Sequence, residues 1–232
     1  MSQEEFVSHF SDADGVDMQD TTTNIDDAVI ADLETIAGRY PKAQSAIIPM
    51  LHLVQSVDGK VSGEGVRHIA RILDITEARV LGVVTFYSMF HAKGVGKHLV
   101  GVCTTSLCAV MGGDIIYESL RRHLGLGEHE DTTADGAFTL ERVECNAACD
   151  FAPVLMLNWE FMDNMTPRKA CEIIDRLREG QRVRASRGPE ITSWRDNERV
   201  LAGFNDGRGD DAPAAGEPSL AGLRLAKETE ND

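Results

Sequence analysis

The sequence predicts a mixed α and β protein, α+β or α/β in class, in which a small N-terminal helical bundle precedes a compact α/β domain. The first observation behind this prediction is the helical spacing of apolar residues between Asp27 and His91. The second is an order of strand, helix, three strands and helix over residues 97–180. The third is the placement of two cysteine pairs after two of the predicted strands.

The composition restricts the classes of function. The 232-residue chain carries a formal net charge of −15, which argues against binding to nucleic acid or to an anionic membrane surface. Its apolar fraction of 42% is enough for a buried core. No apolar run is long enough to cross a bilayer, and the first residues lack the layout of a secretory signal. We therefore expect a cytoplasmic protein whose thiols are reduced.

The bundle is predicted over residues 28–96 as four short helices joined by brief turns. Pro41 ends the first helix, and Pro49 kinks or starts the second because proline is not tolerated in a helix interior. Ser62 and Thr76 can cap the third and fourth helices.

The α/β domain is predicted over residues 97–180. Its first strand is "HLVGV", its second is "AFTLERVE", and "VLMLNWEFMD" folds back on itself as a hairpin. Thr166 and Pro167 begin the last helix as N-cap and first residue, and Gly180 ends it. In the intervening helix we expect three residues to face the core: Ile115, Ile116 and Leu120.

The two ends of the chain have little apolar sequence pattern. Residues 1–27 contain eight acidic residues and no Lys or Arg, which predicts a disordered acidic tail. This tail either only solubilises the protein or docks on a basic partner. Residues 181–232 predict an irregular C-terminal extension.

Cys103, Cys108, Cys145 and Cys149 follow the spacing C-x4-C, 36 residues, C-x3-C. A 2Fe–2S cluster needs two pairs of thiolates, each pair close in sequence, and this spacing provides them. We expect Cys103 and Cys108 to hold one iron, and Cys145 and Cys149 the other. Structural zinc on four cysteines, a redox disulfide and merely buried cysteines are the alternatives, although zinc pairs usually have two-residue gaps. Cys171 has no cysteine nearby and is expected to be a half-buried helix residue.

Three stretches carry a family resemblance: "GVCTTSLCAVMGG", "ADGAFTLERVECNAACDFAPVLMLNWEF" and "TPRKACEIIDRL". They resemble the thioredoxin-like 2Fe–2S subunit of bacterial NADH:quinone oxidoreductase (respiratory complex I), often called its E subunit. The "HLVQSVDGKVS" and "VLGVVTFYSMF" stretches are similar to its N-terminal helical part, so that the likeness spans about residues 30–180. Many members have Leu-Gly between the last two cysteines where this chain has "NAA", a departure that could alter hydrogen bonding near the sulfurs.

The resemblance implies a thioredoxin-like fold and one 2Fe–2S cluster on these four cysteines. It also implies a tight partner, the flavin- and NADH-binding subunit of complex I, together with other peripheral-arm subunits at the cytoplasmic side of the plasma membrane. The chain has no dinucleotide or phosphate-binding motif, so FMN and NADH are expected on the partner, and no complete active site is expected here. An equivalent subunit of an NAD-linked hydrogenase or formate dehydrogenase, or a zinc interaction module built on the four cysteines, is the alternative function.

Overall fold

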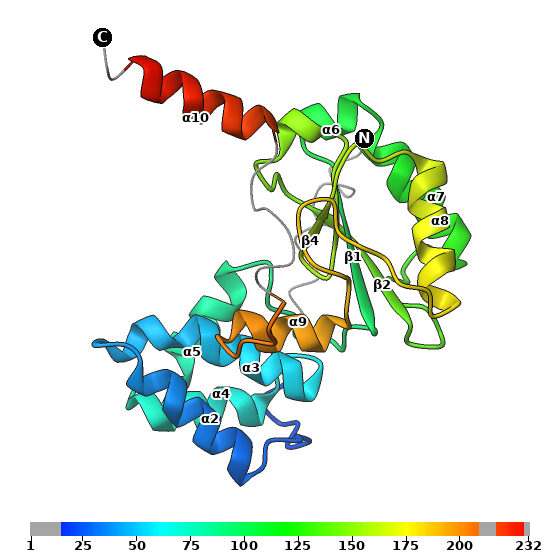
Figure 1. Ribbon diagram of the computed structural model, residues 1–232. Coiled ribbons are helices and arrows are strands. Elements are labelled where there is room, and N and C mark those ends of the chain that lie inside the picture. Colours follow the sequence, from blue (N-terminus) through cyan, green and yellow to red (C-terminus); the bar gives the residue numbers. More distant parts are fainter. Residues whose placement is uncertain (1–14, 209–216, 230–232) are drawn as a thin grey trace. The chain divides into compact units, whose positions relative to one another are not determined.

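The computed structural model describes residues 15–208 and 217–229 and divides the chain into two compact units (Figure 1). Among the described residues, the helical unit comprises residues 15–97 and Ser193–Phe204, and the sheet unit comprises His98–Thr192 and those after Phe204. The chain passes from the helical unit to the sheet unit between Lys97 and His98. The return of residues 193–204 to the first unit is not predicted from the sequence.

The helical unit contains the four expected helices. They are α2 (Asp27–Gly38), α3 (Ile47–Asp58), α4 (Gly63–Leu73) and α5 (Glu77–Phe86), and a short 3-10 helix, η1 (Ala43–Ala46), precedes α3. Pro49 lies in the first turn of α3, where a missing backbone N–H costs little. The hydroxyl of Ser62 accepts a hydrogen bond from Gly65 N–H, as a capping residue should, whereas Thr76 makes no such side-chain bond.

Helix α9 (Trp194–Leu201) belongs to the helical unit, which corrects the prediction that residues 181–232 are irregular. The helix packs against α3, and Trp194 is fully buried. Ser193 and Asp196 form a capping box that fixes its start. Oε2 of the buried Glu198 lies 2.6 Å from Nδ1 of His52 and accepts a hydrogen bond from Gln55 at 2.8 Å.

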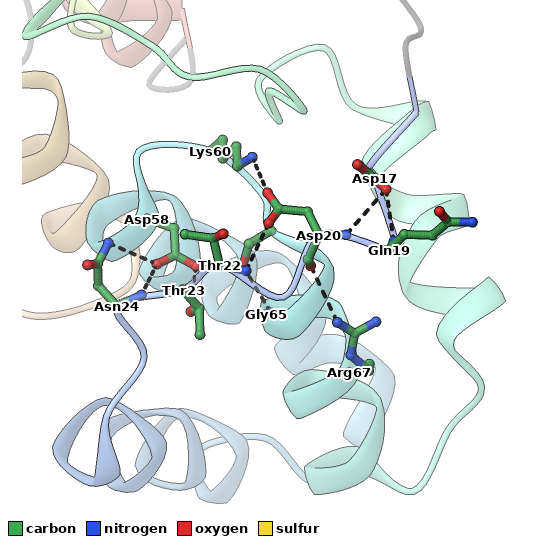
Figure 2. A network of polar contacts seen from close by, with 11 residues as sticks. Asp17, Gln19, Asp20, Thr22, Thr23, Asn24, Asp58, Lys60, Gly65 and Arg67 are labelled. Atoms are coloured by element: carbon green, nitrogen blue, oxygen red, sulfur yellow. Dashed lines mark hydrogen bonds and ion pairs between the residues drawn. The ribbon is translucent and has the colours of Figure 1, made fainter.

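An extended strap, residues 15–26, lies over the α3–α4 turn (Figure 2). The carboxylate of Asp58 accepts hydrogen bonds from Thr23 Oγ1 at 2.8 Å and from Asn24 N–H at 2.6 Å. Lys60 pairs with Asp20 at 3.0 Å. Three apolar residues of the strap, Val16, Met18 and Ile25, pack against the helical core. These contacts hold the acidic tail in place from residue 15 onward, so the prediction of disorder is wrong for this part. Residues 1–14 lie outside the described residues.

The sheet unit is built on four strands in the order β2-β1-β3-β4. These are β1 (His98–Cys103), β2 (Phe138–Val143), β3 (Leu155–Leu157) and β4 (Glu160–Met162). β1 runs parallel to β2, with Cys103 opposite Val143, and antiparallel to β3. Asn158 and Trp159 both have positive φ angles, as the two central residues of a tight hairpin turn require.

Helices α7 (Gly113–Leu124) and α8 (Pro167–Arg178) pack together and share one apolar core with the sheet (Figure 1). Ile116 and Leu120 are buried as predicted, but Ile115 is 62% exposed. The sequence predicts one helix over "AVMGGDIIYESLRRHLG". Gly112, with a φ of 107°, instead separates α6 (Ser106–Val110) from α7, and this break changes which residues face inward. Thr166 caps α8 by accepting from Lys169 N–H, and Gly180 follows it with a φ of 69°.

The chain beyond α8 contains more than irregular structure. Arg184 and Glu190 form an isolated antiparallel bridge, and α10 (Glu217–Thr229) is helical. No helix within the described part of the chain is both long and apolar enough to cross a membrane.

Candidate metal centre

The two cysteine loops leave the sheet at the same edge because β1 and β2 are neighbouring parallel strands. Cys103 is the last residue of β1, and Cys108 follows on the short helix α6. Cys145 comes two residues after the end of β2, and Cys149 begins the 3-10 helix η2 (Cys149–Phe151). The fold therefore brings together the strand ends at which the sequence places both pairs.

Two hydrogen bonds join the loops to each other. The backbone N–H of Thr104 donates to the carbonyl of Val143 at 3.4 Å, and Oγ1 of Thr105 donates to Oε2 of Glu144 at 3.1 Å. Each bond connects a residue beside the first cysteine pair to a residue beside the second.

The two pairs differ in exposure. Cys103 and Cys108 are 3% and 2% exposed, whereas Cys145 and Cys149 are exposed, with their Sγ atoms 3.5 Å apart. The buried pair belongs to a small apolar cluster with three other buried residues, Ala148, Ala152 and Val154. All four are free thiols.

The thiols raise one another's pKa. Burial raises the pKa of Cys108 to about 11, against the opposing effect of a hydrogen bond from the backbone N–H of Val154, and its hydrogen bond with Cys103 raises it further. The pKa of Cys149 is raised first by its hydrogen bond with Cys145 and then by the charge of that neighbour. The charge of Cys103 acts on both Cys108 and Cys149, so the two pairs lie within electrostatic reach of each other. Thiols held in this way are poor anions until a cation replaces their protons.

The surroundings of the thiols fit an iron–sulfur cluster in the donors they offer. The backbone N–H of Ala147 lies 3.4 Å from Cys145 Sγ, and that of Val154 donates to Cys108. The side-chain Nδ2 of Asn146 is buried and has no hydrogen-bond partner among the described residues. An unsatisfied buried donor costs about 1–3 kcal/mol, and hydrogen bonds to sulfur are the usual protein contribution at such clusters.

Two backbone features of this site are not predicted from the sequence. Ala147 has a φ of 55°, a left-handed conformation that favours glycine. A Cβ on the buried Gly113 would lie 2.5 Å from the carbonyl oxygen of Cys103 and 2.9 Å from that of Cys108. The Gly-Gly doublet after the first cysteine pair was the available signal for this close approach.

The thiols are arranged as two neighbouring pairs. Within the described residues, no three side chains of His, Cys, Asp or Glu surround a single point where one metal ion would be held. A tetrahedral zinc site requires all four thiolates around one ion, whereas a binuclear cluster takes two thiolates at each iron.

Cys171 is half-buried against the α7–α8 core, as expected from the sequence.

Comparison with known proteins assigns the chain to a family of 2Fe–2S proteins. Residues 33–178 match the model of the thioredoxin-like [2Fe-2S] ferredoxin family. The E subunit of the NADH-quinone oxidoreductase of Mycobacterium tuberculosis (strain ATCC 25618 / H37Rv) is 48% identical over 200 residues, which cover 86% of this chain and 79% of that protein. Its counterpart in Rickettsia bellii (strain RML369-C) is 38% identical over 148 residues, 62% of this chain and 88% of that protein.

A solved structure shares the fold. An NAD+-reducing [NiFe]-hydrogenase in the H2-reduced state superposes with a TM-score of 0.52 over 60% of this chain, but over only 23% of the hydrogenase chain. At 14% identity this likeness concerns the fold alone. The predicted mixed α and β class and the predicted resemblance are both confirmed: the chain belongs to the thioredoxin-like [2Fe-2S] ferredoxin family and is a relative of the E subunit of NADH-quinone oxidoreductase.

Proposed function

We propose that this protein is the iron–sulfur electron-transfer subunit of an NADH:quinone oxidoreductase. Cys103, Cys108, Cys145 and Cys149 hold one 2Fe–2S cluster, the first two at one iron and the last two at the other. When bound, the cluster accepts and releases one electron at a time. The observation that supports this proposal best is the convergence of four thiols, as two pairs, at one edge of the sheet.

The two pairs have different tasks. The buried thiols of Cys103 and Cys108 lie among apolar side chains, which exclude water from one side of the site. The exposed thiols of Cys145 and Cys149 leave the other side open to a partner. The carboxylates of Glu144 and Asp150 flank the exposed pair and oppose added negative charge.

A partner subunit is proposed as the source of electrons. Because the sequence has no dinucleotide-binding motif, FMN and NADH belong to the partner, and the active site is complete only in the assembly. Around Cys108, α6 and the start of α7 expose large apolar side chains of the kind that protein interfaces cover. These are Leu107, Val110, Met111 and Ile115, which are 44%, 86%, 53% and 62% exposed.

The relatives support the proposed parent complex. Proteins that are 48% and 38% identical over most of their length are subunits of NADH-quinone oxidoreductase, whereas the hydrogenase shares the fold only. We therefore place the chain in the peripheral arm of complex I, on the cytoplasmic side of the plasma membrane, rather than in an NAD-linked hydrogenase or formate dehydrogenase.

Replacing one proposed ligand tests the assignment. Cys149→Ala should remove the EPR signal of the dithionite-reduced protein, because three thiolates and an open iron position do not hold the cluster. Cys171→Ala is the matched control and should retain the full signal, since that thiol lies on α8 in the core. An unchanged signal in Cys149→Ala refutes the ligand set.

A further inference from the structure

Asn146, in the turn of the exposed cysteine pair, has a buried side-chain donor that is unused within the described part of the chain. Its Nδ2 atom is buried without a hydrogen-bond partner. Buried polar groups in proteins almost always have a partner, and an exception calls for an explanation such as an ion or group that completes the site.

Asn146 lies in a turn that is rich in sulfur acceptors. It lies in the tight turn between Cys145 and Cys149, whose Sγ atoms are 3.5 Å apart. The next residue, Ala147, already directs its backbone N–H to Cys145 Sγ. The buried side chains grouped around Cys103 and Cys108 are apolar or end in sulfur, so sulfur is the acceptor that these side chains can offer.

We propose, on the basis of the proposed function, that Asn146 Nδ2 donates a hydrogen bond to a sulfur of the bound cluster and raises its reduction potential. The reduced cluster carries one more negative charge than the oxidised cluster. A donor to sulfur therefore stabilises the reduced form more strongly. The nearby carboxylates of Glu144 and Asp150 act in the opposite direction, so the amide offsets part of their effect.

Replacement of the amide by an apolar group of similar size provides the test. Asn146→Leu is purified anaerobically with its cluster, and its reduction potential is measured by an EPR-monitored redox titration beside that of the wild-type protein. We expect a lower potential in Asn146→Leu. Pulsed EPR of protein labelled with ¹⁵N in asparagine side chains should show a nitrogen coupling to the reduced cluster in the wild type, and this coupling should be absent from the variant.

Cys171→Ala, on α8 away from the four cysteines, is the control; its potential and nitrogen coupling should be those of the wild type. If Asn146→Leu does not retain iron, the smaller Asn146→Ala carries the same expectation. A potential and a nitrogen coupling equal to those of the wild type overturn the inference about Asn146. Absence of any EPR signal from the reduced wild-type protein overturns the proposed function instead.

Discussion

The strap over the helical unit and the cysteine end of the sheet unit, where the two cysteine loops lie, are both irregular segments. The polar groups of the strap have hydrogen-bond partners, whereas a buried donor at the cysteine end has none. In the strap, Thr23 and Asn24 donate hydrogen bonds to Asp58 of α3, and Asp20 pairs with Lys60 (Figure 2). At the cysteine end, Asn146 Nδ2 has no partner among the described residues. The buried thiol of Cys108 is also hard to ionise, with a pKa of about 11.

The backbone of the cysteine loops also carries strain. Ala147, midway between Cys145 and Cys149, adopts a left-handed conformation, although glycine would adopt it at lower cost. Local strain and unsatisfied groups that persist in a folded protein concentrate at functional sites. The strap is thus complete as the chain builds it, whereas the cysteine end requires a bound group to complete it.

Removal of the cluster should give the largest effect and should separate the two regions most clearly. A ligand present at a thousand times its dissociation constant stabilises the state that binds it by about 4 kcal/mol. When the cluster is removed, the free energy of opening at β1 and α6 should fall by at least this amount, so that their amide hydrogens exchange faster. Exchange in α3 and α4 should change little. Hydrogen-exchange mass spectrometry of the loaded and cluster-free protein measures both. Equal losses of protection in the two units would contradict the comparison.

Glu198→Ala should give the next largest effect, confined to the helical unit. The substitution removes the partner of the buried His52 and Gln55, and breaking a buried hydrogen-bonded pair costs about 3 kcal/mol. Denaturant unfolding followed by tryptophan fluorescence reports the loss, with Trp159 of the sheet unit replaced by Phe in every variant so that Trp194 is the fluorophore. The control is Glu34→Gln, an exposed substitution in the same unit, which should change stability by less than about 0.5 kcal/mol. Equal stability of the two variants would show that the buried pair contributes nothing.

Ala147→Gly should stabilise the cluster-free sheet unit by about 1 kcal/mol, because glycine adopts the left-handed conformation without the clash of a Cβ. Hydrogen exchange at β2 in the cluster-free protein is the measurement. Destabilisation by this substitution would show that no strain is stored at Ala147.

The smallest expected effect is a pH dependence at the strap. Hydrogen bonds lower the pKa of Asp20 from 3.8 to about 2. The bond from Thr22 N–H has the largest effect, and the bond from Lys60 has a smaller one. Because the pKa in the folded state is below that of the unfolded state, the carboxylate adds stability above about pH 4. This contribution is lost as the pH falls toward 2. The difference in stability between wild type and Asp20→Asn should therefore shrink between about pH 5 and pH 2, and a difference that stays constant over this range would contradict the assignment.

The strands, and the placement of the cysteine pairs after two of them, could be predicted from the sequence because their signals are local. The apolar run of β1 ends at Cys103, and Thr166-Pro167 is a helix start that depends on adjacent residues only. The strap could not be predicted in this way, since Thr23 and Asn24 find their partner Asp58 more than 30 residues away. Its few apolar residues have neither helical nor strand spacing, and composition alone indicates disorder.

Helix α9 and the role of Asn146 were missed for different reasons. The capping box at Ser193 was readable in the sequence, but α9 has only eight residues, of which Trp194 anchors it in the core. The burial of Asn146 Nδ2 depends on how two loops meet at the sheet edge, and no local pattern contains that information. The assignment of the four cysteines as ligands remains a prediction that the geometry supports.

Iron and acid-labile sulfide analysis of the anaerobically purified protein tests the central claim most directly. We expect about two irons and two sulfides per chain, together with an EPR signal that appears on reduction with dithionite. A preparation that contains about one zinc per chain, or neither iron nor sulfide, would contradict the account.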